Sequence, residues 1–141
     1  MTKRILILSA YLWASPNTLF AIAVGMLLGG RMRLHSGVLE IHGHRVRRVL
    51  ASMPIAANAM TMGHVVFGQS PVALDRTRLH ERVHVHQYER WGPFFIPAYL
   101  ACSAYLYLVG RDGYRDNPFE VAAYAVDDPG HPRLRTGHPT E

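Results

Sequence analysis

An apolar stretch near the start of the sequence constrains the fold more than any other feature. Residues 5–29 are almost entirely apolar, but a Ser-Pro-Asn-Thr segment at 15–18 divides them in two. A helix capped within this segment and running over about 18–28 would reach roughly 16 Å, well short of a hydrocarbon core of about 30 Å. One continuous helix, kinked at the proline, would be long enough to cross a bilayer.

Three interpretations of this stretch stay open on the residues alone. It could be a helix that is buried or lies against a membrane, a helix that crosses the membrane, or a cleaved signal sequence. Basic residues flank the stretch on both sides, so they set no orientation. The small residues at 21–23 would suit cleavage, but the apolar run continues past them, which makes secretion the least favoured of the three.

Composition narrows the class of protein. A chain of 141 residues fits one domain, and 49% hydrophobic with 18% charged residues argues against a disordered chain or a coiled coil. The net charge of +5 permits attraction to phosphates or anionic lipid without naming a partner. Because Cys102 is the only cysteine, a metal site would have to use the nine histidines and the carboxylates.

The order of expected elements gives an α+β fold. We expect a single domain over residues 1–126, with a short antiparallel sheet, and a loose tail over 127–141. The expected elements are a hairpin of 37–42 and 45–50 turning at Gly43, a strand over 60–67, and helices over about 75–90, 94–109 and 117–126. The apolar helix over 94–109 reads as a core helix, with Cys102 as an inert core residue.

The sequence His80-Glu81-Arg82-Val83-His84 lies inside the expected helix over 75–90. On a helix His80 and His84 stack one turn apart, so both imidazoles could meet one Zn²⁺ at about 2.0–2.1 Å. Glu81, about 100° round the axis, could take the proton of a water that zinc activates. A pattern with three fixed positions also arises by chance, so it needs support from elsewhere in the chain.

A catalytic zinc usually takes three protein ligands, and the third must come from outside this motif. His86 is the wrong candidate, because it lies about 160° round the helix from His84. Glu120 is the better one, since it follows a helix start and projects from a rigid element. The same position also suits a capping box with Asn117 as N-cap, so both roles are considered for Glu120.

The His80–His84 motif, followed by Asn117-Pro118-Phe119-Glu120-Val121-Ala122-Ala123-Tyr124, resembles the gluzincin zinc metallopeptidases, especially minimal single-domain bacterial forms. The resemblance covers roughly residues 60–126. It implies a small zincin-like domain in which an active-site helix and a later glutamate helix hold the zinc. Carried over, His80, His84 and Glu120 are the ligands and Glu81 is the general base.

The family pattern often has an aspartate where this chain has Tyr124, so support for the ligands must come from elsewhere. Gln87, Asp116 and Asn117 are the candidates. Tyr124, on the same helical face as Glu120, could donate to a developing oxyanion.

The surroundings of the motif add further candidates. Tyr114 and His64 are two more candidate oxyanion donors, although His64 could simply pack. In this family an edge strand pairs with an extended peptide, and the strand over 60–67 could do so here. We interpret the arginines at 45–48 as a solvent-exposed edge of the expected hairpin and not as a phosphate-binding site.

These observations favour a zinc-dependent hydrolase, expected to be a peptidase acting on a peptide or protein substrate. The alternative is a catalytically silent, zinc-stabilised interaction protein at a membrane surface. A nucleic-acid binder is not expected, because no motif supports one. We expect the protein in the bacterial cytoplasm or at the inner membrane, and the sequence does not indicate its oligomeric state.

Overall fold

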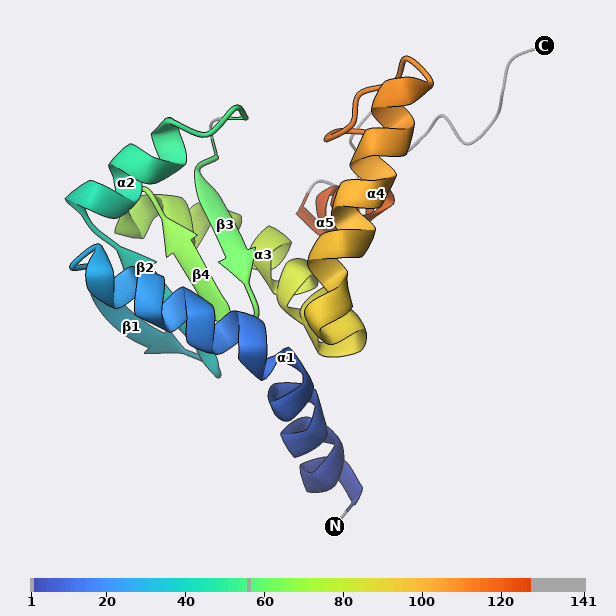
Figure 1. Cartoon of the computed structure of the whole chain (residues 1–141). Coiled ribbons are helices and arrows are strands. Elements are labelled where there is room, and N and C mark those ends of the chain that lie inside the picture. The colour runs from blue at the N-terminus through green and yellow to red at the C-terminus, as the bar shows by residue number, and fades with distance from the viewer. Residues whose placement is uncertain (1, 56, 128–141) are drawn as a thin grey trace.

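The computed structural model describes residues 2–55 and 57–127, and within them it shows five α-helices and one four-stranded sheet (Figure 1). The α+β fold class is confirmed. Of the predicted tail, 127–141, the residues from 128 onward lie outside the described residues, and Asp127 ends α5. The elements in chain order are α1 (Thr2–Leu27), β1 (Arg31–His35), β2 (Val38–His42), α2 (His44–Ala51), β3 (Ala59–Met62), β4 (Val65–Gly68), α3 (Pro71–Trp91), the 3₁₀ turn η1 (Gly92–Phe94), α4 (Phe95–Leu108) and α5 (Pro118–Asp127).

Helix α1 is continuous through Pro16, so of the two helical alternatives the kinked one is the one observed. The helix bends near its middle (Figure 1). Proline has no N–H to donate to the carbonyl of Leu12, and the Ser15 hydroxyl donates to that carbonyl instead, at 2.7 Å. The polar segment that we expected to cap a new helix therefore stabilises a kinked one.

The sheet has the strand order β1-β2-β4-β3 and is mixed. β1 pairs antiparallel with β2, and β3 pairs antiparallel with β4, but β2 and β4 run parallel. The purely antiparallel sheet that we expected is therefore wrong in its central pairing. A parallel pair needs a crossover connection, and α2 and β3 supply it.

Two expected strands take other forms. The predicted hairpin at Gly43 is wrong, because residues 44–51 form α2, which buries Val46 and Leu50 four residues apart on one helical face. The hairpin partner of β2 is β1, joined through Ser36 and Gly37 with positive φ angles. The expected strand over 60–67 is two strands, which turn at Gly63 with φ 62°.

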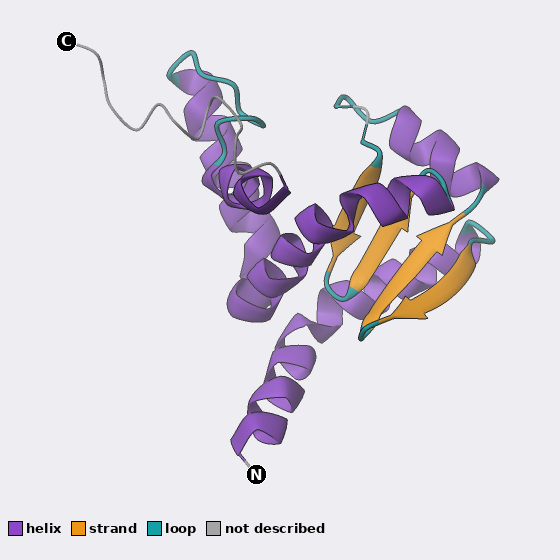
Figure 2. Cartoon of the chain, turned by 180° about the vertical axis from the view of Figure 1, so that it is seen from behind, coloured by secondary structure: helices purple, strands orange, loops and turns teal. Residues whose placement is uncertain are grey.

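The two faces of the sheet pack against different helices (Figures 1 and 2). On one face Ile41, Val65 and Phe67 pack against residues of α1 and α2. On the other face Val38 and Val66 pack against Leu74 and Val85 of α3. Successive strand residues thus serve opposite layers, and α3 is fixed along one side of the sheet.

Helix α3 begins at Pro71, four residues before the expected start, because Ser70 caps it by accepting a hydrogen bond from the Ala73 N–H at 3.1 Å. Helix α4 follows the η1 turn, close to the expected bounds. Its expected burial is wrong for much of its length, because only Phe95 and Leu106 are buried and Cys102 is partly exposed. The arginines at 45–48 are exposed on α2, as expected of a solvated edge.

Candidate metal centre

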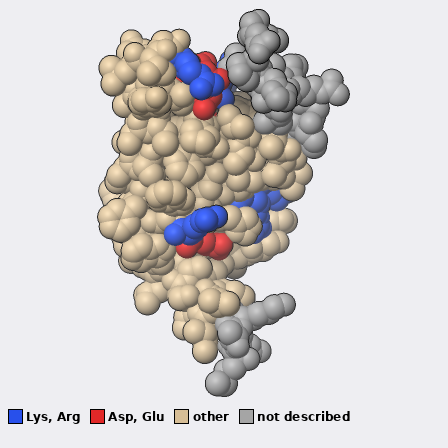
Figure 3. Space-filling view, turned by 90° about the vertical axis from the view of Figure 1, so that its right-hand side faces the viewer, with Lys and Arg blue, Asp and Glu red and all other residues tan. Residues whose placement is uncertain are grey.

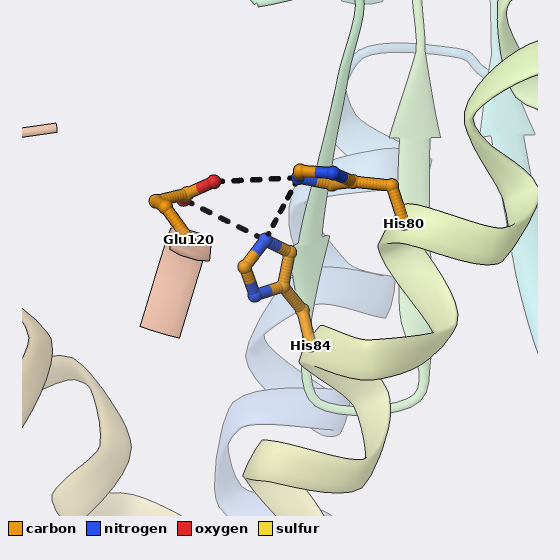
Figure 4. Close-up of side chains that lie close together, drawn as sticks. All are labelled: His80, His84 and Glu120. Carbon is orange, nitrogen blue, oxygen red and sulfur yellow. Dashed lines mark hydrogen bonds and ion pairs between the residues drawn. The ribbon is translucent and has the colours of Figure 1, made fainter. Parts of the chain in front are cut away.

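The side chains of His80, His84 and Glu120 converge between α3 and α5 (Figure 4). The two Nε2 atoms lie 3.2 Å apart. The carboxylate oxygens of Glu120 lie 3.3 Å from His80 Nε2 and 3.5 Å from His84 Nε2. Tetrahedral ligand atoms at 2.0–2.1 Å from a metal are separated by about 3.3 Å, so these three groups could hold one metal ion.

Local structure explains why the three groups meet. His80 and His84 are four residues apart on α3, and their side chains therefore project from one face. Glu120 stands in the first turn of α5, which packs against α3. Asn117 caps α5 by accepting from the Phe119 N–H at 3.1 Å, and so fixes where this turn begins.

Gln87, one of the residues proposed to support the ligands, is hydrogen-bonded to His84. Its Oε1 accepts a hydrogen bond from His84 Nδ1 at 2.8 Å, while its Nε2 donates to the Phe119 carbonyl at 3.0 Å. This second bond orients the amide, so that the imidazole proton is held on Nδ1. Burial lowers the pKa of His84, but the neighbouring Glu120 and Glu81 outweigh it and raise the pKa above its usual value, so a bound metal would replace a proton on Nε2.

Tyr99 of α4 is the other residue that positions a ligand group. Its hydroxyl donates to Glu120 Oε1 at 2.8 Å. Burial raises the pKa of Tyr99, and the negative charge of Glu120 raises it further, so the phenol stays protonated and keeps donating.

The second oxygen of Glu120 has no such partner. Glu120 Oε2 is buried without a hydrogen bond among the described residues, although the imidazole of His80 lies nearby. Burial would raise the pKa of Glu120, but His80, His84 and Tyr99 outweigh it and hold the pKa at about 2. A charged carboxylate with an unsatisfied oxygen, facing two imidazole nitrogens, fits a cation at this point.

Glu81 is buried beside this cluster and points toward β3. Thr61 donates its hydroxyl to Glu81 Oε2 at 2.6 Å. Burial raises the pKa of Glu81, against the opposing effects of His84 and Thr61. A carboxylate of this kind accepts a proton more readily than an exposed one does.

The two candidate tyrosines lie together at the same end of the cluster. The ring of Tyr124 meets the ring of His80 edge-on, with centroids 4.7 Å apart. Its hydroxyl donates to that of Tyr114 at 3.4 Å. Tyr124 therefore borders the cluster directly, and Tyr114 is linked to it through Tyr124.

The structure places the remaining candidates elsewhere. His64 is buried at the β3–β4 turn, where Nε2 pairs with Glu89 at 3.0 Å and the ring stacks on Tyr11. Asp116 accepts from the backbone of Asp112, outside the cluster. Asn117 touches none of the three ligand groups; besides capping α5, its Nδ2 donates to the Tyr99 carbonyl at 3.1 Å and to Ser103 Oγ at 2.8 Å, and so joins α5 to α4. His86 faces away, as expected, with its side chain 70% exposed.

Sequence reasoning assigned no role at the cluster to Tyr99 or Thr61. Tyr99 carries a hydroxyl in an otherwise apolar helix, and the need of that hydroxyl for a partner was the available signal. Thr61 gave no comparable signal, because its contact with Glu81 depends on β3 lying beside α3.

Comparisons of the chain with protein-family models, with curated proteins and with solved structures give no match, so what is known of this site comes from its own geometry.

Proposed function

We propose that the protein is a zinc-dependent hydrolase that cleaves peptide bonds. The observation that carries this proposal is the spacing of 3.2–3.5 Å among the His80, His84 and Glu120 ligand atoms, next to the buried Glu81. That spacing suits a metal with tetrahedral coordination and three protein ligands, which leaves one position for water or substrate.

The donor set favours zinc among the metals that would fit. Two imidazole nitrogens and one carboxylate oxygen suit zinc, whereas Mg²⁺ and Ca²⁺ prefer sites built from oxygen alone. The hydrogen bond from His84 to Gln87 and that from Tyr99 to Glu120 are of the kind that orients zinc ligands.

The residues around the cluster divide the chemical work. When bound, zinc acidifies a water molecule and polarises the carbonyl under attack. Glu81 accepts the proton of the attacking water and delivers it to the leaving amine, and Thr61 holds its carboxylate in place. The hydroxyl of Tyr124 donates to that of Tyr114 in the free protein, and it would turn from Tyr114 to the carbonyl oxygen as negative charge develops there.

Strand β3 gives a reason to expect an extended peptide as substrate. It is an edge strand, and it lies beside α3. The bond from Gln69 N–H to the Asn58 carbonyl sets the ladder register, so the main-chain groups of Ala59 and Thr61 face the free edge. A peptide paired with this edge would run past Glu81, which Thr61 contacts.

Zinc content and turnover test the proposal separately. We expect the purified protein to bind one zinc per chain, and His84→Ala to lose it. His86→Ala, which alters an exposed histidine of the same helix, is the matched control and should keep the metal. Glu81→Gln should keep zinc and lose peptide hydrolysis. Full activity in that variant would show that Glu81 is not the general base.

A second candidate is a catalytically silent, zinc-stabilised protein at a membrane surface. It is favoured by α1, in which residues Ile5–Leu27 are apolar and long enough to cross a bilayer, but largely exposed. Signal sequences and core helices can have the same length and composition. Membrane association is therefore proposed here and is not a finding. Zinc binding without hydrolysis of a broad peptide library would support this candidate over the first.

A further inference from the structure

The outward side of α1 is apolar from Ile5 to Leu27. Seven large apolar residues on this side have 59–80% of their surface exposed, and we call them the outward stripe. They recur every three or four residues, and therefore lie on one side of the helix. The seven are Ile5, Leu8, Leu12, Leu19, Phe20, Met26 and Leu27; Pro16 and Ala23, also exposed, lie between them.

The inward side of the same helix is fixed to the rest of the protein. Ala14 and Ala21 are fully buried, and Ala21 belongs to the core formed with the sheet. The Thr18 hydroxyl accepts a hydrogen bond from the His64 N–H at 3.0 Å. If α1 crossed a bilayer in this arrangement, it would carry β1, an edge strand, into the hydrocarbon, where open sheet edges are not tolerated.

The Ser and Thr hydroxyls of α1 between Ile5 and Leu27 are satisfied within the helix, whereas Tyr11 and Asn17 donate to the carbonyls of Gly37 and Gly92. Ser9 donates to the Leu6 carbonyl at 2.9 Å, and Ser15 donates to the Leu12 carbonyl. Thr18 donates in the same way to the Ala14 carbonyl at 3.1 Å. These hydroxyls therefore need no water, and α1 can enter an apolar medium on its outward side.

The nature of the apolar medium follows from the shape of this surface. Residues Ile5–Leu8 are four consecutive apolar side chains, each at least 58% exposed, and steps of about 100° point them in four directions. A flat protein surface would cover only some of them, whereas fluid lipid adapts to the shape of a helix that lies in one leaflet.

Charge points to an anionic lipid surface. The first 39 residues contain four basic and no acidic side chains, and residues 41–74 add three arginines of α2 and no acid. Basic residues near an apolar helix face strengthen binding to anionic headgroups.

Helix α4 lies on the same side of the molecule as α1 and also has exposed apolar side chains. α1 and α4 both lie toward the viewer in Figure 1, and both lie on the far side in Figure 2. Leu100, Tyr105, Tyr107 and Leu108 of α4 are exposed. The left edge of Figure 3, which is the side that faces the viewer in Figure 1, shows neither acidic nor basic side chains.

We propose that α1 binds in the plane of one leaflet of an anionic bilayer, with the outward stripe in the acyl chains, and does not cross the membrane. The sheet and α3 then stand on the water side of this helix. This attachment is independent of whether the metal centre is catalytic.

Depth measurements test the orientation of α1. Single nitroxide labels are placed at Leu8→Cys, Leu12→Cys, Leu19→Cys and Met26→Cys in full-length Cys102→Ala protein, bound to phosphatidylcholine vesicles containing phosphatidylglycerol. We expect all four labels at similar depths within one leaflet, and a control label at Arg76→Cys, on the exposed side of α3, in water. A crossing helix would instead change depth by about 1.5 Å per residue, or about 27 Å from residue 8 to residue 26, and that gradient would overturn the proposal.

Vesicle binding tests the surface itself. Leu12→Ser and Leu19→Ser should each weaken partitioning onto the same vesicles by about tenfold or more, because a buried leucine is lost from the acyl layer. Leu79→Ser is the matched control, since Leu79 is 60% exposed on α3 and should not matter. Unchanged partitioning of both variants, labels that all stay in water, or a lipid-free dimer that the two substitutions dissociate would each contradict the proposal.

Discussion

Two buried carboxylates in this protein, Glu40 and Glu120, are equally hidden from solvent but meet different partners. Glu40 of β2 lies between two guanidinium groups, with Arg33 Nη2 at 2.6 Å and Arg78 Nε at 3.0 Å. Glu120 faces two imidazoles and a phenol.

The two carboxylates differ in whether their partners can lose a proton. Arginine stays charged at all accessible pH values, so Glu40 has a permanent counter-charge and both of its oxygens are satisfied. Histidine, unlike arginine, can give up a proton to a metal, and among the described residues Glu120 Oε2 has no hydrogen bond. The first arrangement stabilises the fold by itself, while the second has ligand atoms spaced so that they could hold a cation.

The largest expected effect is the loss of metal in Glu120→Ala compared with Glu40→Ala. Removal of a ligand should weaken zinc binding by well over the 10–100-fold that loss of an orienting partner typically costs. Glu40→Ala should leave zinc affinity unchanged, because its partners are Arg33 of β1 and Arg78, which lies about 160° round α3 from His80. Competition with a chromophoric chelator measures both affinities. Equal losses of zinc affinity in the two variants would contradict the assignment of Glu120, and not Glu40, as a metal ligand.

Tyr99→Phe tests whether the hydrogen bond from Tyr99 positions Glu120 for metal binding. It removes the hydrogen bond to Glu120 Oε1 and keeps the ring in its packing with Phe95 and Phe119. We expect zinc affinity to fall about 10–100-fold, as for other partners that orient a ligand. Tyr105→Phe removes a hydroxyl from an exposed ring of the same helix and serves as the control. Equal affinities in the two variants would show that the hydroxyl of Tyr99 does not position Glu120.

The contrast between the two carboxylates also shows how far the sequence could predict this protein. The His80–His84 pair follows from helical spacing alone, and the α+β class follows from the order of apolar segments. Glu120 was added by a family resemblance, because no local rule brings a residue 36 positions away to His84. Its proximity depends on the packing of α5 against α3.

Other features depended on contacts that no local pattern contains. The residues 45–50 alternate enough to suggest a strand, but they form a helix because Val46 and Leu50 share a buried face. Proline in α1 suggested a break, and the Ser15 hydroxyl removes the need for one. The Arg33–Glu40–Arg78 group joins two strands and a helix, so its members gave no signal as a set.

Glu40→Gln should destabilise the protein itself, whatever its metal content. It removes charge-assisted hydrogen bonds to Arg33 and Arg78 and leaves their donors partly unpaired, which should cost about 1–3 kcal/mol of unfolding free energy. Urea denaturation with and without zinc measures the loss. We expect the same decrease in both conditions, whereas a decrease seen only with zinc would tie Glu40 to the metal centre.

The pH dependence of unfolding gives the smallest and most specific difference. Burial would raise the pKa of Glu40, but Arg78 and Arg33 outweigh it and hold the pKa below its usual value of 4.5. Because the folded pKa is the lower one, the carboxylate stabilises the fold above pH 4.5, and this contribution is lost as the pH falls toward the folded pKa. The stability of the unmodified protein should therefore fall more steeply with acid than that of Glu40→Gln, by at most about 1.4 kcal/mol per pH unit. Denaturation curves of both proteins, collected without metal from pH 6 down to about 3, measure the difference between the slopes. Parallel slopes would mean that the two guanidinium groups do not bind the charged form of Glu40 preferentially, and the contrast with Glu120 would then rest on metal binding alone.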